Sequence, residues 1–325
     1  MPFWSWGKNK WNPDGKHCYV TGGSVGLGLA LATILASRGA HVSIVARGKQ
    51  RLADAIEVIE SHRQRPDQIF RSFSFDLCSA EGAEAALDAV VADHEGLTPD
   101  AIFLCAGVAT PRFFVESTAK DLIDGMNLGY WTEAWTSWAV TRRMVQQGRQ
   151  GKIVFIASTL CYMTFVGWSS YSPARHAVRG LADTLRSELQ LYNIDVHLFS
   201  PNTMLTPGYD EEQKTKPKIT LKIEEGDTPL TAEQAAIGLI KGIEANHAHI
   251  SADFITELFR ASTRGSAPGH NFVYDWALDM MAMIGAPIWR SSVDTLIRAH
   301  RAEHAEYLQT NGVLSTHGDP GPTVK

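Results

Sequence analysis

The chain has 325 residues, of which 30 are lysine or arginine and 35 are aspartate or glutamate, so its formal net charge is −5. This length supports one large core, since single α/β domains often exceed about 100 to 200 residues. Because the charges nearly balance and no polybasic run occurs, the composition excludes an electrostatic nucleic-acid surface and indicates small-molecule partners.

Cysteine usage indicates the redox environment. The four cysteines, Cys18, Cys78, Cys105 and Cys161, lie far apart in or beside apolar runs. This pattern favours small buried thiols over a disulfide framework or a metal site. We therefore expect a reducing compartment and no metal. The N-terminus has no long apolar stretch behind a basic start, so we expect neither a secretory signal nor a spanning helix there.

Short apolar segments alternate with helical patterns over the first 200 residues. Helices are expected over residues 26–38 and through Ile59, between strand-like runs. These runs are His17–Thr21, His41–Ala46, Ile69–Phe75, Ala101–Ala106, Lys152–Ala157 and Asp195–Ser200. Near-continuous hydrophobic runs are typical of strands buried on both faces of a parallel sheet. The sequence therefore predicts an α/β fold, a Rossmann-type doubly wound parallel sheet, in a single domain over residues 16–260.

Two segments after residue 200 depart from this rhythm. Residues 203–228 are rich in Pro, Lys and Glu without a clean period, which indicates an insertion over the carboxyl edge of the sheet, a candidate substrate lid. Thr231 and Gln234 then match a capping box that opens a helix to about Ala245. Residues 312–325 are polar and rich in Gly and Pro, so we expect a disordered tail.

Residues 261–311 are expected to form an apolar helical C-terminal extension. Its segment Asn271–Trp289 contains ten large apolar side chains and two charges, Asp275 and Asp279, and is too short and too charged for a transmembrane span. Two interpretations stay open. One is a buried helix or dimer face, and the other is insertion into one leaflet with Arg290 and Arg298 at the headgroups.

The N-terminal tail, residues 1–15, is aromatic. Phe3, Trp4, Trp6 and Trp11 are interleaved with Lys8 and Lys10. Such a mixture suits a membrane–water interface, although packing of the tail onto the fold explains it as well. Together with the apolar C-terminal segment, the tail favours membrane contact.

The first predicted strand leads into a glycine-rich turn, Thr21-Gly-Gly-Ser-Val-Gly-Leu-Gly28. Backbone amides at the start of the following helix would face an anion, which in dinucleotide folds is the pyrophosphate. Glycines allow the tight turn and the close backbone approach, and Gly28 is expected to let the helix pack against the first strand. The residues expected to bind a dinucleotide here are Gly22, Ser24, Gly26 and Gly28.

The end of the second strand indicates which dinucleotide is bound. An NAD site normally has an acidic residue there, but this sequence has Arg47. A guanidinium suits a 2′-phosphate, with Lys49 and Arg51 as second contacts, so we expect NADPH. The alternative is that Arg47 merely ends a strand in solvent. After the third strand, Asp76 with Leu77 is expected to read the adenine.

Three polar residues follow in a characteristic order: Asn127, Ser158 and Tyr171. With the glycine turn and the strand end Cys105–Gly107, they resemble the short-chain dehydrogenase/reductase superfamily over Lys16–Pro207. The resemblance implies carbonyl reduction, in which Tyr171 is the acid, Ser158 bonds the substrate oxygen and Asn127 holds a water for proton supply.

The superfamily has a lysine four residues after this tyrosine, whereas this chain has Arg175. A fixed cation lowers the pKa of a tyrosine from its usual ~10 and can grip the nicotinamide ribose. Arginine keeps the charge but does not release its proton, so we expect cofactor binding to survive better than turnover. The Pro201-Asn-Thr203 segment also departs from the superfamily's usual Pro-Gly and then Thr.

The lid, through Thr206–Glu212 and Lys214–Pro217, and the run Arg179–Ala182 are similar to the fungal 3-ketodihydrosphingosine reductases of sphingolipid synthesis. This resemblance implies NADPH-dependent reduction of a long-chain keto-sphingoid lipid at the cytosolic face of the endoplasmic reticulum membrane. Glu211 or Glu212 could then face the substrate's ammonium group, although their sequence context favours exposed loop charges.

The superfamily resemblance further implies a homodimer or homotetramer paired through the helices that carry Asn127 and Tyr171. Two other functions stay open. One is a steroid or retinoid reductase linked to membranes, and the other is a non-catalytic NADP(H)-binding or scaffold protein.

Overall fold

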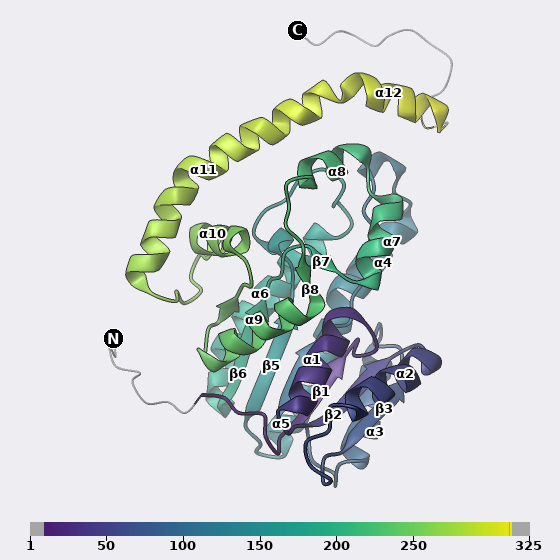
Figure 1. Ribbon diagram of the computed structural model, residues 1–325, viewed down its shortest axis with the longest axis vertical. Helices are drawn as coiled ribbons and strands as arrows, with labels where there is room; N and C mark the ends of the chain where they lie inside the picture. The colour runs from purple at the N-terminus through teal and green to yellow at the C-terminus, as the bar shows by residue number, and fades with distance from the viewer. Residues whose placement is uncertain (1–9, 312, 314–325) are drawn as a thin grey trace.

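The computed structural model describes residues 10–311 and 313, and in this part of the chain a parallel sheet is the centre of the fold (Figure 1). Its seven strands have the order β3-β2-β1-β4-β5-β6-β9, and each adjacent pair is parallel. The strands are β1 (His17–Thr21), β2 (His41–Ala46), β3 (Phe70–Ser74), β4 (Ala101–Leu104), β5 (Gly151–Ile156), β6 (Ile194–Phe199) and β9 (His249–Ile250). The strand order reverses between β1 and β4, which opens a crevice at their carboxyl ends.

The predicted doubly wound parallel sheet is confirmed. The six predicted strands all form, with ends that differ from the predicted ones by at most two residues. Most of them are recognisable because they are buried runs: every residue of β1 and of β4 is buried, whereas the edge strand β3 buries only Phe70. The seventh strand, β9, was not predicted, since two residues are too short to show a periodicity.

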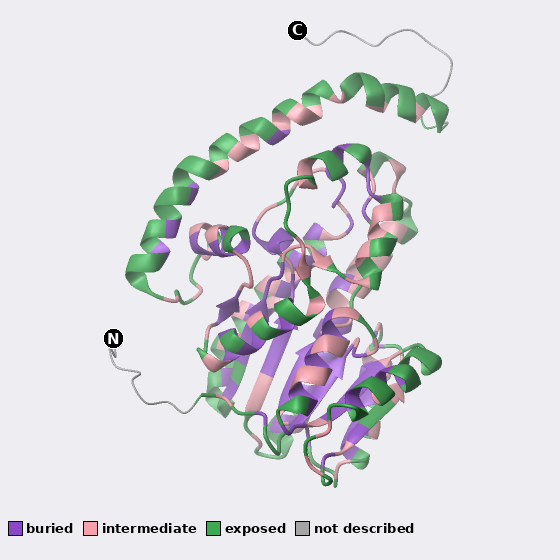
Figure 2. Cartoon of the chain, in the orientation of Figure 1, coloured by how far each residue is buried: buried purple, intermediate pink, exposed green. Residues whose placement is uncertain are grey.

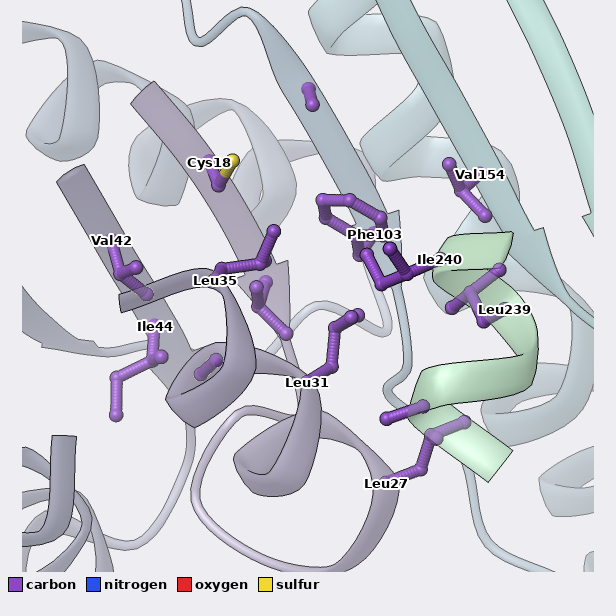
Figure 3. Packing of buried hydrophobic residues seen from close by; sticks show 14 of the residues in the cluster. Cys18, Leu27, Leu31, Leu35, Val42, Ile44, Phe103, Val154, Leu239 and Ile240 are labelled. Carbon is purple, nitrogen blue, oxygen red and sulfur yellow. The ribbon is translucent and has the colours of Figure 1, made fainter. Parts of the chain in front are cut away.

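Helices cover both faces of the sheet. On one face, buried side chains of α1 (Gly26–Ser37), α2 (Lys49–Glu60) and α9 (Ala232–Glu244) form a core with β1, β2 and β4. Figure 3 shows Leu31 and Leu35 of α1 and Leu239 and Ile240 of α9 around Phe103 of β4. The opposite face is covered by α3 (Ala80–Ala92), α5 (Thr132–Gln146) and α6 (Ser172–Glu188).

Irregular turns connect these layers. A capping box at Thr231 and Gln234 starts α9, as predicted. The short helix α4 (Ala119–Met126) continues into a π-helical segment, Asn127–Trp131, before α5 begins. There are 3₁₀ turns at Phe114–Glu116, Thr159–Cys161 and Leu189–Tyr192.

The predicted insertion is more regular than its sequence suggests. Between β6 and α9 it forms α7 (Pro207–Thr215) and α8 (Lys218–Glu224), flanked by the paired strands β7 (Met204–Leu205) and β8 (Leu230–Thr231). Thr206 starts α7, because its side chain accepts a hydrogen bond from Tyr209 N–H at 3.2 Å. In Figure 1 both helices lie beyond the carboxyl ends of the sheet strands.

The C-terminal extension is helical, as α10 (Phe254–Thr263), α11 (Phe272–Ala299) and α12 (Arg301–Thr310). The long helix α11 arches over α10 and the lid helices and is exposed along much of its length (Figures 1 and 2). It nevertheless buries Leu278, Ala282 and Val293. The extension therefore has one packed face and one exposed face.

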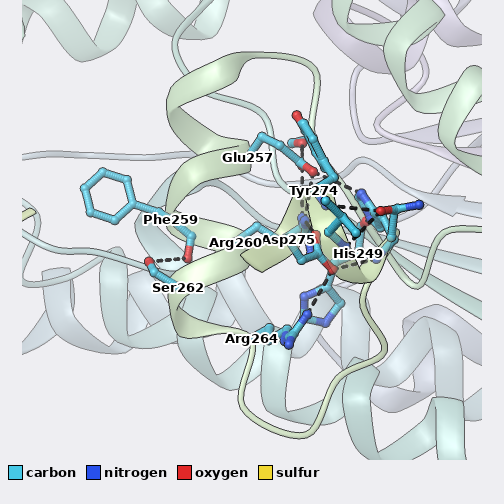
Figure 4. A network of polar contacts seen from close by, with 12 residues as sticks. His249, Glu257, Phe259, Arg260, Ser262, Arg264, Tyr274 and Asp275 are labelled. Carbon is cyan, nitrogen blue, oxygen red and sulfur yellow. Dashed lines mark hydrogen bonds and ion pairs between the residues drawn. The ribbon is translucent and has the colours of Figure 1, made fainter. Parts of the chain in front are cut away.

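A network of buried ion pairs fastens α11 to α10 (Figure 4). Arg260, which is fully buried, donates to Glu257 at 2.8 Å and to Asp275, and Arg264 donates to Asp275 at 2.9 Å. Burial by itself would raise the pKa of Glu257, but hydrogen bonds from His270 and Arg260 hold it at about 2. The carboxylates are thus occupied by arginine, which makes this cluster a structural clamp.

The N-terminal aromatics are only partly described. Trp11 packs against the core, with its ring centroid 6.2 Å from that of Phe103. For this residue, packing onto the fold is the correct interpretation. The other three aromatics of the tail and nearly all of the predicted disordered tail lie outside the described residues.

Candidate active site

A cavity of about 1220 Å³ lies along the carboxyl ends of the sheet strands. Its wall begins at the glycine turn after β1, continues past the ends of β2 to β5 and the start of α6, and finishes on α7, α8, α10 and α11. One cavity thus joins the predicted cofactor residues to the lid and to the C-terminal extension.

The glycine turn fits a dinucleotide. Gly22 and Gly26 have φ of +64° and +56°, a conformation that side chains disfavour. A Cβ on Gly22 would lie 2.8 Å from the carbonyl oxygen of Cys105, and one on Gly28 only 2.4 Å from the Gly22 oxygen. Gly28 therefore allows the start of α1 to approach the residues that directly follow β1. This cradle places the start of α1 against the cavity, as anion binding requires.

A hydrogen bond connects the end of β1 with the segment that follows β4. The Thr21 hydroxyl accepts a hydrogen bond from the Ala106 N–H at 3.1 Å. This bond holds residues 105–107 beside the glycine turn, where they line the cavity. Cys78 and Cys105 also lie on this wall and are partly exposed, whereas Cys18 and Cys161 are buried as expected. All four thiols are free.

Three exposed cations lie at the β2 end of the cavity: Arg47, Lys49 and Arg51. Within the described part of the chain, no carboxylate lies within 4.0 Å of any of them, so their charges are available to a ligand. Ser24 of the glycine turn also lines the cavity.

The predicted adenine contacts lie on the same wall. Asp76 and Leu77 follow β3 and line the cavity. Hydrogen bonds from Cys78, including one from its backbone N–H at 3.0 Å, lower the pKa of Asp76 and keep its carboxylate charged. Leu77 is buried.

Ser158 and Tyr171 meet in the middle of the cavity. Ser158 follows β5, and its Oγ accepts a hydrogen bond from Leu160 N–H at 3.2 Å, so it also caps a 3₁₀ turn. Tyr171 immediately precedes α6. Burial raises the pKa of Tyr171, and the charge of Arg175 and a hydrogen bond with Ser158 offset this only in part. The cation therefore acts in the expected direction, because the charge of Arg175 lowers the pKa of Tyr171, but burial outweighs it.

Arg175 lies one turn further along α6 and is held by a buried acid. Its Nη1 donates to Glu133 Oε1 at 2.7 Å and to the Ile156 carbonyl at 2.8 Å, while its Cζ lies 4.8 Å from the centroid of the Tyr171 ring. The second oxygen of Glu133 accepts from Ile156 N–H at 3.3 Å. Arg175 and Glu133 therefore hydrogen-bond the carbonyl and the N–H of Ile156. This is the last residue of β5 and lies two residues before Ser158.

Glu133 is a site residue that was not predicted from the sequence. Burial raises its pKa, and the charge of Arg175 offsets part of that rise. A signal was present: Glu133, Thr136 and Val140 share the i, i+3, i+7 spacing of one buried helix face, where an isolated acid needs a partner. Its charge also partly cancels the positive field that Arg175 was expected to supply.

Asn127 opens the π-helical segment between α4 and α5, and its carbonyl accepts a hydrogen bond from Thr132 N–H. Within the described chain the cavity wall includes Leu128 and Thr132 but not Asn127. π-Helical segments often occur at functional sites. Gly129 of the same segment lies close to Arg175, because a Cβ there would be 3.6 Å from its Nη2.

The far end of the cavity combines apolar walls with lid acids. Glu212 of α7 and Glu224 of α8 line it, while Glu211 is exposed and paired with Lys214 at 2.6 Å. The apolar wall at this end comprises Met163, Phe165, Ile255, Leu258, Phe259, Ala286 and Trp289.

The family is shown by sequence comparison. The family described as short chain dehydrogenase matches residues 16–217. The chain therefore belongs to the short-chain dehydrogenase family of oxidoreductases, which confirms the predicted superfamily.

Two curated relatives of similar length share one name within this family. A 3-ketodihydrosphingosine reductase of Cryptococcus neoformans var. neoformans is 43% identical over 312 residues, covering 96% of this chain and 93% of its own. A 3-ketodihydrosphingosine reductase of Aspergillus fumigatus is 35% identical, covering 82% and 79%.

Solved structures share the fold. Levodione reductase has a TM-score of 0.66 at 21% identity, covering 74% of this chain and 96% of its own. A short-chain dehydrogenase from Sphingobium yanoikuyae, in complex with NADPH, has a TM-score of 0.63 at 22% identity, covering 73% and 87%.

Proposed function

We propose that this protein catalyses the NADPH-dependent reduction of the C3 ketone of 3-ketodihydrosphingosine to dihydrosphingosine, a step of sphingolipid biosynthesis. Similarity to curated reductases of that name over nearly the whole chain supports the proposal. The observation that carries it is one continuous cavity. Its lining includes Tyr171 and Ser158, the glycine turn and the apolar wall under the lid.

The reacting groups have distinct roles. When bound, the reduced nicotinamide supplies the hydride that the ketone carbon receives. The Tyr171 hydroxyl donates a proton to the ketone oxygen, and Ser158 hydrogen-bonds that oxygen as its charge develops. Arg175 faces the tyrosine ring and holds the nicotinamide ribose. Asn127 holds a water of the proton supply from the π-helical segment beside Arg175.

The preference for NADPH rests on Arg47, Lys49 and Arg51. A phosphate ester is recognised best by cations that have no other partner, and a guanidinium can bind it with two parallel hydrogen bonds. The remaining contacts are those of Gly22, Ser24, Gly26 and Gly28 with the pyrophosphate and of Asp76 and Leu77 with the adenine.

Membrane contact at the cytosolic face of the endoplasmic reticulum belongs to the same proposal. No helix in the described part of the chain is long and apolar enough to cross a bilayer. However, α11 exposes a series of large apolar side chains while its Gly285, Ala286 and Trp289 line the cavity. A helix that meets lipid on one side and the substrate chamber on the other suits a substrate that resides in the bilayer.

We further propose a homodimer or homotetramer that pairs through the helices following Asn127 and Tyr171. Exposed apolar side chains on α5, namely Trp138 and Val145, support this surface, because pairing would cover them.

The test is NADPH oxidation in detergent micelles with 3-ketodihydrosphingosine, comparing the wild-type protein with Tyr171→Phe. We expect substrate-dependent oxidation that falls at least about 100-fold without the phenolic proton donor. A wild-type protein that oxidises NADPH only with steroid or retinoid carbonyls would contradict the substrate. One that binds NADPH but turns over none of these substrates would support the scaffold alternative.

A further inference from the structure

The lid helix α7 directs one carboxylate into the cavity. Successive residues of a helix point about 100° apart, so Glu211 and Glu212 cannot share a face. Glu211 points into solvent and pairs with Lys214, whereas Glu212 lines the cavity and is largely buried. The structure thus distinguishes two acids that the sequence could not.

Among the described residues, the cation that pairs with Glu212 is Lys216, which bonds more closely to Glu224. The Lys216 ammonium is buried and lies 2.7 Å from Glu224 but 3.9 Å from Glu212. It also lies 5.1 Å and 5.4 Å from the ring centroids of Trp168 and Tyr209. Among the described residues no donor forms a hydrogen bond with the carboxylate of Glu212. This acid therefore has unused hydrogen-bonding capacity facing the cavity.

Glu212 lies within electrostatic reach of the proton donor. Its charge raises the pKa of Tyr171, and the Trp168 ring, 5.5 Å from that of Tyr171, lies between the lid and the tyrosine. In a 2-amino ketone the ammonium is on the carbon next to the carbonyl. An acid that binds this ammonium must therefore line the same cavity as the tyrosine, as Glu212 does.

We propose that Glu212 is the specificity-determining residue that accepts the substrate's ammonium group. The inference rests on the proposed function, since it concerns the amine of a 2-amino ketone. A charge-assisted hydrogen bond in a partly desolvated site is stronger than one at the surface. The apolar wall beyond receives the alkyl chain.

The ionisation of Glu212 supports this role. Burial raises its pKa to about 7, with Glu224 adding to the rise and Lys216 opposing it. A bound ammonium favours the carboxylate form and lowers that pKa again. Between pH 6 and pH 8 the free carboxylate becomes mostly ionised, so affinity for an ammonium ligand increases over this range.

The test compares 3-ketodihydrosphingosine with its desamino analogue, a 1-hydroxy-3-ketone of the same chain length. For Glu212→Gln we expect KM for the amino ketone to rise about tenfold or more, and kinetics with the desamino ketone to stay within about twofold. Glu211→Gln, the matched control, changes neither. The wild-type preference for the amino ketone should increase from pH 6 to pH 8 and be flat in Glu212→Gln.

Two results would overturn the inference: unchanged amino-ketone kinetics in Glu212→Gln, or equal losses with both ketones. Failure of the wild-type protein to reduce either ketone would overturn the proposed function instead. Binding of dihydrosphingosine and of the desamino diol would then decide about Glu212. Equal affinities of the wild-type and Glu212→Gln proteins for dihydrosphingosine would contradict its role.

Discussion

Two residues hold Arg175 and determine where its charge acts. Because Glu133 and the Ile156 carbonyl occupy the same guanidinium nitrogen, the arginine is fixed beside Tyr171 but is partly neutralised. A lysine ammonium has enough donors for both bonds, but its shorter side chain would not reach the position of this guanidinium nitrogen, so the two bonds would lengthen or be lost. The arginine thus stabilises the packing of β5, α5 and α6 against one another. It cannot take part in a proton relay, because it does not release its proton.

For Arg175→Lys we therefore expect kcat to rise about threefold or more, since lysine can exchange its proton. The melting temperature should fall, because lost hydrogen bonds of a buried charge cost about 1–3 kcal/mol. Steady-state kinetics and thermal unfolding measure the two effects. Arg179→Lys, one turn further along α6, is the control and leaves kcat unchanged. An equal or lower kcat in Arg175→Lys would show that the arginine does not impair turnover.

At the scale of elements, α11 combines two interpretations that the sequence left open, because it has both a packed face and an exposed apolar face. A helix with one packed and one exposed apolar face is bound to the body by the Arg260 clamp rather than by a wide core. The exposed side chains are Phe272, Val273, Trp276, Met280, Met281, Met283, Ile284 and Ile288. A contiguous exposed apolar face of this kind marks a site of contact with lipid or with another apolar surface.

For Met281→Asp/Ile284→Asp we expect co-sedimentation with vesicles of endoplasmic-reticulum lipid composition to weaken about tenfold or more, because two charges must then be desolvated at the interface. Both side chains are exposed, so the fold should persist. Val58→Asp/Leu191→Asp, at exposed apolar positions outside α11, is the matched control. If the two double variants bind vesicles equally well, α11 is not the membrane-facing element.

At the scale of the whole molecule, a dinucleotide bound at the centre of the sheet should stabilise the entire domain. A ligand at about 100 times its Kd adds about 2.7 kcal/mol to the free energy of unfolding, which raises the melting temperature by several degrees. We expect a larger shift with NADPH than with NADH, and Arg47→Ala should remove the difference. Differential scanning calorimetry measures this without turnover. Equal shifts with both cofactors in the wild-type protein would contradict the 2′-phosphate assignment.

Much of this molecule was predictable because its signals are local. Five of the six predicted strands are largely buried runs, and glycine is required in the turn because a Cβ on Gly28 would lie 2.4 Å from a backbone oxygen. The order of Ser158 and Tyr171 along the chain indicated the family, which the comparisons confirm. Strand β9 left no such signal, because its two residues are held by tertiary pairing with β6.

The sequence by itself determined the parallel sheet, the dinucleotide turn and the chemical class, because periodicity and close backbone contacts constrain residue types directly. Only the tertiary structure paired Glu133 with Arg175 across 42 residues and placed Glu212 rather than Glu211 on the wall of the cavity. It also placed one side of α11 on the cavity wall. Such contacts depend on the three-dimensional positions of separate elements, and the order of residues along one element does not contain that information.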